Sequence, residues 1–159
     1  MSDKFLTIYL NDHLAGAIGG SELAKRTAQN NEGTEFGPRL EKLASDIEED
    51  RQSLESLMER LGIKKDLLKD AAAWMAEKVG RLKLNGQLTG YSDLSRLVEL
   101  EGLTLGVEGK LSLWRNLSEV LAAYPAIEPG ELQELQTRSE DQRKELEELR
   151  RKAASIALG

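Results

Sequence analysis

The sequence predicts an all-α fold, a four-helix bundle with a long helical crossover between helices two and three. Its 159 residues include only three prolines and 4% aromatic residues, a composition that favours long helices over sheets. Apolar residues recur at helical spacing in four long segments, and turn residues separate these segments. The connection between the second and third segments is far longer than antiparallel neighbours need. We therefore expect residues 1–159 to form a single helical-bundle domain.

Composition and charge narrow the class of protein further. Hydrophobic residues make up 40% of the chain and charged residues 31%, which is typical of a folded, soluble protein. The formal net charge of −6 argues against nucleic acid as a partner. The chain has no cysteine, no signal-peptide pattern at its start and no apolar run long enough to cross a membrane. We expect a cytoplasmic protein that binds neither nucleic acid nor membrane.

The first helix is predicted over about residues 3–29. Ser2 or Asp3 can cap its start, because short polar side chains bond the free amides of a first turn. Its apolar stripe begins at Leu6 and advances in steps of four and three residues. The run Asn30-Asn31-Glu32-Gly33 ends the helix.

The second helix is predicted over about residues 38–61, between two strong boundary signals. Pro38 suits a first helical turn, and Gly62 suits the position just after a last turn. Asp50 is the one polar residue in its apolar stripe. A further amphipathic helix is predicted over about residues 64–82. It would carry the chain back along the bundle, so that helices two and three run parallel.

The third helix, over about residues 92–124, is predicted to be the centre of the bundle. Its apolar residues cover nearly every side, and a helix that is apolar all round is a buried one. We therefore expect Leu105 and Leu111 to lie in the core, and Gly106 to allow a close helix crossing. A proline-containing turn follows, and the fourth helix is predicted over about residues 129–158.

Polar residues interrupt the predicted inner stripe of every helix. They are His13, Asp50, Glu101, Thr104, Glu108, Ser139 and Gln142. Buried carboxylates are costly unless they are paired or bound to a metal. The four candidate metal ligands are therefore His13, Asp50, Glu101 and Glu108. In the alternative, the carboxylates lie at the edge of the core or are paired with cationic side chains, for which the candidates are Lys25, Arg26, Arg51, Lys110 and Arg115.

Taken together, these features resemble the ferritin-like superfamily, and in particular uncharacterised bacterial ferritin-like domain proteins. Metal-binding members carry a glutamate on helices one and three and a Glu-x-x-His pair on helices two and four. The corresponding residues on helices one and three are Glu22 or His13, and Glu101 or Glu108. On helices two and four the chain has Asp46-x-x-Glu49 and Glu145-x-x-Glu148, neither of which contains a histidine. The resemblance thus implies the architecture, and the departure implies that no intact di-iron site is present.

The predicted function is a structural or interaction role, with no cofactor and with a homodimer or another protein as the partner. This interpretation favours a protein that is not an enzyme. One alternative is a metal-binding ferritin-like oxidase or storage protein that holds iron or manganese in a degenerate carboxylate site. A second alternative is a small-ligand or anion-binding module. Its anion site would lie at the start of helix three, near Arg81, Lys83, Tyr91 and Arg96.

Overall fold

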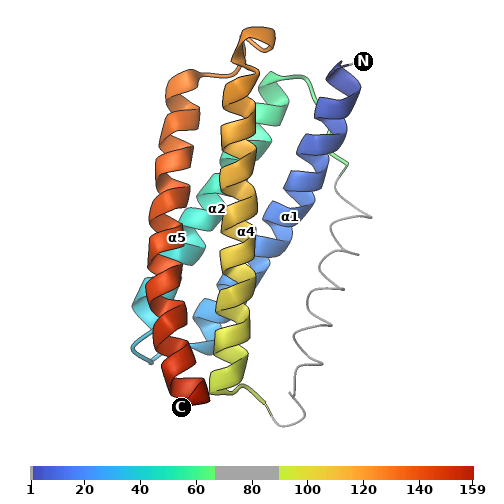
Figure 1. Ribbon diagram of the computed structural model, residues 1–159. Helices are drawn as coiled ribbons and strands as arrows, with labels where there is room; N and C mark the ends of the chain where they lie inside the picture. Colours follow the sequence, from blue (N-terminus) through green and yellow to red (C-terminus); the bar gives the residue numbers. More distant parts are fainter. Residues whose placement is uncertain (1, 67–89) are drawn as a thin grey trace.

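The computed structural model describes residues 2–66 and 90–159 (Figure 1). These residues form four α-helices and a short 3₁₀ turn, η1, with no β-strand among them. The helices are α1 (Ser2–Asn30), α2 (Gly37–Arg60), α4 (Asp93–Glu119) and α5 (Pro129–Leu158), and η1 spans Leu121–Ala123. The all-helical bundle that the sequence predicts is therefore present. Residues 64–66 of the predicted crossover helix are not helical, and its residues 67–82 lie outside the described part of the chain.

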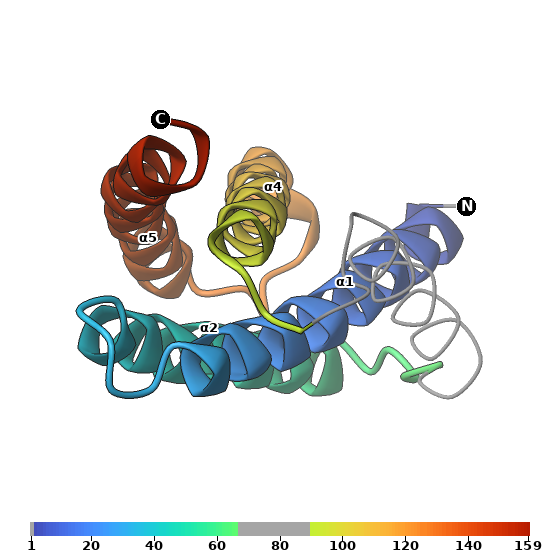
Figure 2. The same ribbon diagram turned by 90° about the horizontal axis from the view of Figure 1, so that it is seen from below.

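The four helices form two antiparallel pairs in two layers, α1 with α2 and α4 with α5 (Figure 2). Side-chain contacts show how the layers are oriented. Arg60 at the end of α2 pairs with Glu131 at the start of α5, and Arg39 near the start of α2 pairs with Glu148 near the end of α5. Helices α2 and α5 are thus antiparallel. Because α4 and α5 are also antiparallel, α2 and α4 run parallel, as the long connection predicts (Figure 1).

Helix boundaries follow the local sequence. Pro38 lies in the first turn of α2, and Gly62 follows that helix with a φ of 67°, a left-handed conformation that favours glycine. Ser92 and Ser95 form a capping box at the start of α4. Helix α4 ends at Glu119, earlier than predicted. The amide of Val120 bonds to the carbonyl of Leu117, which tightens the chain into the 3₁₀ turn.

The core consists of two apolar clusters at different heights of the bundle. One includes Phe36, Leu40, Leu100, Leu103, Leu146 and Ala153. The other includes Leu10, Leu57, Trp114, Leu117 and Leu132. Each cluster draws residues from all four helices, and polar side chains occupy the level between the two.

The expectation that α4 is buried on every side is wrong. Leu111 is completely buried, whereas Leu105 is 77% exposed. The buried face of α4 is defined by Leu100, Leu103 and Val107, and Leu105 lies on the other side of the helix. Gly106 also lacks the expected close contact, because a Cβ atom there would have no neighbour within 4 Å. The close approach to α1 occurs at Gly102, where a Cβ atom would lie 3.2 Å from Leu23.

Candidate functional site

A layer of polar side chains crosses the core between the two apolar clusters. We define the polar layer as Asp50 of α2, Lys110 of α4, and Arg138 and Gln142 of α5. The ammonium of Lys110 donates to Asp50 Oδ2 at 2.7 Å and to Gln142 Oε1 at 2.5 Å. Gln142 Nε2 donates to Asp50 Oδ2 at 2.8 Å. Arg138 Nε lies 2.7 Å from Asp50 Oδ1, an ion-pair distance, although its N–H is not aligned for a hydrogen bond.

The carboxylate of Asp50 is the centre of this layer, and only 1% of the residue is exposed. A buried carboxylate is tolerated where opposite charges and hydrogen bonds replace the lost water. Lys110, Gln142 and Arg138 supply these interactions. Burial lowers the pKa of Lys110, and the adjacent Asp50 acts in the opposite direction. Asp50 is therefore a carboxylate paired with cationic side chains, the alternative to a metal ligand that the sequence allowed. Its contacts link α2, α4 and α5 at one height of the bundle.

The four predicted metal ligands are not brought together. His13 is half-buried and lies edge-on to the ring of Tyr9, with centroids 4.6 Å apart. Burial lowers the pKa of this imidazole, although Asp12 partly offsets the effect. Glu101 and Glu108 are exposed, so the expectation that they face the core is wrong. Both lie on the same outer side of α4 as Leu105.

Six of the acidic residues at the positions that the ferritin-like resemblance implies form ion pairs within the chain. Glu22 pairs with Lys25, and Glu108 pairs with Arg143. On α2 and α5, the pairs are Asp46 with Lys42, Glu49 with Arg138, and Glu145 and Glu148 with Arg39. Within residues 2–66 and 90–159, no group of three or more histidine or acidic side chains is placed to share a metal ion.

We expect the purified protein to hold no stoichiometric iron, manganese or zinc. A di-metal carboxylate site in such bundles uses about four carboxylates and two histidines, and this chain has one histidine. Elemental analysis of protein expressed in iron-supplemented medium is the measurement. About one or more irons per chain, lost on Glu108→Ala, would contradict the expectation and support the oxidase alternative.

A polar groove runs between α2 and α5, with a volume of about 840 Å³. We call it the α2–α5 groove. Its charged lining residues are six acids and three bases: Asp46, Glu49, Glu131, Glu134, Asp141, Glu145, Arg39, Lys42 and Arg138. Glu134 and Asp141 are exposed, and neither has an ion-pair partner among the described residues. No motif in the sequence predicted this groove. The available signal was the polar series of α2 from Arg39 to Ser53, spaced by three and four residues.

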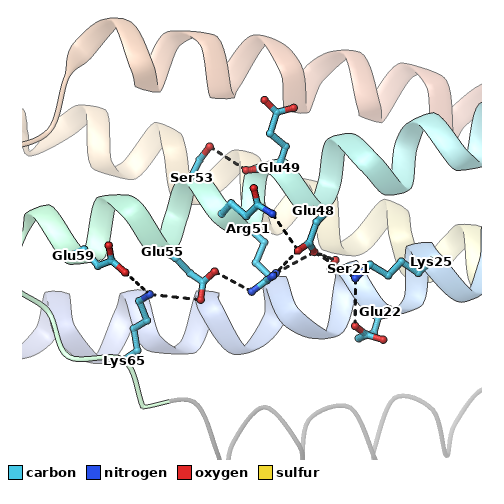
Figure 3. A network of polar contacts seen from close by, with 11 residues as sticks. Ser21, Glu22, Lys25, Glu48, Glu49, Arg51, Ser53, Glu55, Glu59 and Lys65 are labelled. Atoms are coloured by element: carbon cyan, nitrogen blue, oxygen red, sulfur yellow. Dashed lines mark hydrogen bonds and ion pairs between the residues drawn. The ribbon is translucent and has the colours of Figure 1, made fainter.

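A second network of charges joins α1 to α2 on another face (Figure 3). Lys65 contacts Glu59 and Glu55, Arg51 contacts Glu55 and Glu48, and Glu48 also accepts a hydrogen bond from Ser21. Hydrogen bonding to Arg51 lowers the pKa of Glu48 to about 2. Each of these acids already has a cationic partner. We therefore interpret this network as a structural link between α1 and α2.

The predicted anion site at the start of α4 is filled by the protein's own side chains. In the Ser92–Ser95 capping box, the amide of Ser95 donates to the Ser92 hydroxyl and the amide of Ser92 donates to the Ser95 hydroxyl. Arg96 contacts Asp93 at 2.9 Å and Asn31 at 2.5 Å, and its guanidinium lies 4.5 Å from the centre of the Phe36 ring. Arg81 and Lys83 lie outside the described residues.

Comparisons of the chain with protein families, with curated proteins and with solved structures found no match. In the described ranges 2–66 and 90–159, no helix has the length and apolar character needed to span a membrane. Function is therefore inferred from the geometry of the residues alone.

Proposed function

We propose that this chain is an interaction protein that binds a basic segment of a partner protein in the α2–α5 groove. The observation that carries the proposal is the pair of unpartnered acids, Glu134 and Asp141, on the α5 wall of that groove. Cationic side chains of a partner would supply the opposite charges that these two acids lack.

The helix arrangement explains why a groove exists at this place. The closely packed helix pairs are α1 with α2, α4 with α5, and α1 with α4. Between α2 and α5, the interactions described are made mainly by long charged side chains. Arg39 reaches Glu145 and Glu148, Arg60 reaches Glu131, and Arg138 reaches Glu49. These bridges hold the two helices at a distance, which leaves space over the polar layer.

The charge of the groove indicates the chemistry of its occupant. Twice as many acids as bases line it, and the net charge of −6 would attract a basic segment over a longer range. Leu43 and Leu135 also line the groove, so an apolar side chain could contact its floor. These features fit a segment that presents lysine or arginine beside apolar residues, as amphipathic helices do when they bind grooves.

We also propose that the bundle is ferritin-like. Two antiparallel pairs with α2 parallel to α4 support a ferritin-like bundle, which here would serve as a scaffold without a di-metal centre. A cytoplasmic location and self-association into a homodimer remain predictions from the sequence. The mass of the protein in solution, measured by light scattering, tests self-association separately from binding in the groove.

The test uses a fluorescent amphipathic peptide of lysine and leucine, titrated with the protein at low and moderate salt. The double variant Glu134→Gln/Asp141→Asn is expected to bind it about two- to thirtyfold more weakly. The physical reason is that each exposed charge pair contributes roughly 0.2–1 kcal/mol. The difference is expected to shrink as salt screens the charges.

A matched double variant separates the groove from the overall charge. Glu101→Gln/Glu119→Gln removes the same two charges from exposed positions on α4. It should bind the peptide like the unmodified protein, apart from a small uniform loss. Equal weakening in both double variants would reject the groove as the binding site. If the groove variant instead converted a dimer to a monomer, a second copy of the chain would be its occupant.

A further inference from the structure

Asn30, Asn31, Tyr91, Arg96 and Glu99 form a second polar group, which we call the end cluster; Asn31 and Glu99 are buried within it, and Asn30 and Tyr91 are exposed. It lies where α1 ends and α4 begins, and none of its residues lines the α2–α5 groove. Asn31 accepts from Arg96 at 2.5 Å and donates to the hydroxyl of Tyr91 at 2.7 Å. These contacts fasten the start of α4 to the end of α1.

Glu99 is the member of this cluster whose hydrogen bonding is incomplete. Only 5% of the residue is exposed, Oε1 lies 3.4 Å from Asn30 Nδ2, and the buried Oε2 has no hydrogen-bond partner among the described residues. The buried carboxylate of Asp50 has a cation 2.7 Å from each of its oxygens, and no such ion pair to Glu99 is present in the part of the chain that the structure describes. The geometry at Glu99 instead suits a neutral carboxylic acid, because the charged form has little to replace its water.

The charged and titratable groups near Glu99 on neighbouring elements do not outweigh the effect of its burial. They are Arg26 on α1, Arg96 on α4, and Tyr91 just before α4. Burial raises the pKa of Glu99, and this effect exceeds the opposing effects of Thr27, Asn30 and the two arginines. Burial together with the nearby Glu99 raises the pKa of Tyr91 to about 12. Tyr91 therefore stays protonated over the range in which Glu99 titrates.

We propose that Glu99 is a proton-operated latch that holds the start of α4 against the end of α1 when protonated and loosens this end when ionised. Loosening follows because an ionised carboxylate gains hydration by moving toward solvent, and that movement separates the elements around it. The latch does not depend on the proposed function, since Glu99 does not line the groove.

The direction of the pH dependence follows from the raised pKa. In the unfolded chain Glu99 ionises near its ordinary value of 4.5. In the folded protein it keeps its proton to higher pH. Below the pKa that Glu99 has in the unfolded chain, the side chain is protonated in both states and its burial costs no stability. As the pH rises from that pKa through the higher pKa of the folded protein, the folded state loses stability relative to the unfolded chain. The loss is complete above the pKa of the folded protein.

The experiment is amide hydrogen exchange of the whole chain, corrected for intrinsic rates, between pH 5 and pH 8. In the unmodified protein, protection over residues 93–100 is expected to fall relative to Glu99→Gln, about tenfold for each unit by which the pKa is raised. Glu99→Gln, which cannot ionise, should keep its protection across this range. Glu101→Gln, an exposed change two residues along α4, should behave like the unmodified protein.

Three results would overturn the latch. The first is an identical pH dependence in Glu99→Gln and the unmodified protein. The second is a loss of protection that is equal at residues 93–100 and at residues 111–117, which would indicate global unfolding. The third needs no variant: an NMR titration of the Glu99 side-chain carboxyl that gives a pKa at or below 4.5.

Discussion

Replacing Asp50 with alanine is expected to lower the free energy of unfolding by about 3–5 kcal/mol. Removing one partner of a buried ion pair leaves an uncompensated charge, which is why such changes are severe. Here the charge left behind is the largely buried ammonium of Lys110, which in the unmodified protein donates to Asp50 at 2.7 Å. Arg138 would be less affected, because its side chain is 30% exposed and can turn toward solvent. Denaturant unfolding at pH 7 is the measurement.

The matched control is Glu49→Ala, a change at the residue directly before Asp50. Glu49 pairs with the same Arg138, but its side chain is largely exposed. Glu49→Ala should therefore cost under about 1 kcal/mol. The double variant Asp50→Leu/Lys110→Met should recover much of the loss, because it removes both charges of the buried pair and fills their volume with apolar atoms. Similar costs for Asp50→Ala and Glu49→Ala would show that the polar layer does not hold the bundle together.

Replacing Leu111 with alanine is expected to cost about 2–5 kcal/mol. Leu111 is completely buried in α4, close to the polar layer. Truncating such a leucine removes its transfer free energy and leaves a cavity that the neighbours fill only in part. Thermal and denaturant unfolding would both report the loss, with little change in the denaturant dependence if the fold is retained.

Leu105→Ala makes the same chemical change on the same helix and serves as the control. Because Leu105 is 77% exposed, its truncation should alter the free energy of unfolding by no more than about 0.5 kcal/mol. If both variants lost similar stability, the orientation of α4 about its own axis would be different from the one described. If Leu111→Ala had no effect, Leu111 would not be a core residue.

Much of the polar layer, though not the α2–α5 groove, could be predicted from the sequence, because local periodicity places its residues. Asp50 and Gln142 interrupt regular apolar stripes, so their inward positions follow from helix periodicity. Lys110 was already among the cations weighed as partners of a buried carboxylate. Arg138 and Glu99 were missed. Arg138 adjoins the buried Ser139 on α5 but is itself partly exposed. Glu99 is buried, although it is not among the polar residues predicted to face the core.

The sequence by itself determined the class of fold and most helix ends. Pro38, Pro129, Gly62 and the Ser92 cap act within one turn of the chain, so their effects do not depend on distant neighbours. The length of the connection before α4 also determined that α2 and α4 run parallel, because it must return the chain along the bundle.

Only the tertiary structure decided which side of α4 faces the core. Its apolar residues surround the helix, so the pattern has no preferred direction and allows several rotations about the axis. Packing against α1 and α5 selected the rotation that buries Leu111 and directs Lys110 toward Asp50. The same rotation placed Leu105, Glu101 and Glu108 outside. The α2–α5 groove likewise depends on the distance between two helices that are far apart in the chain, and no local pattern encodes that distance.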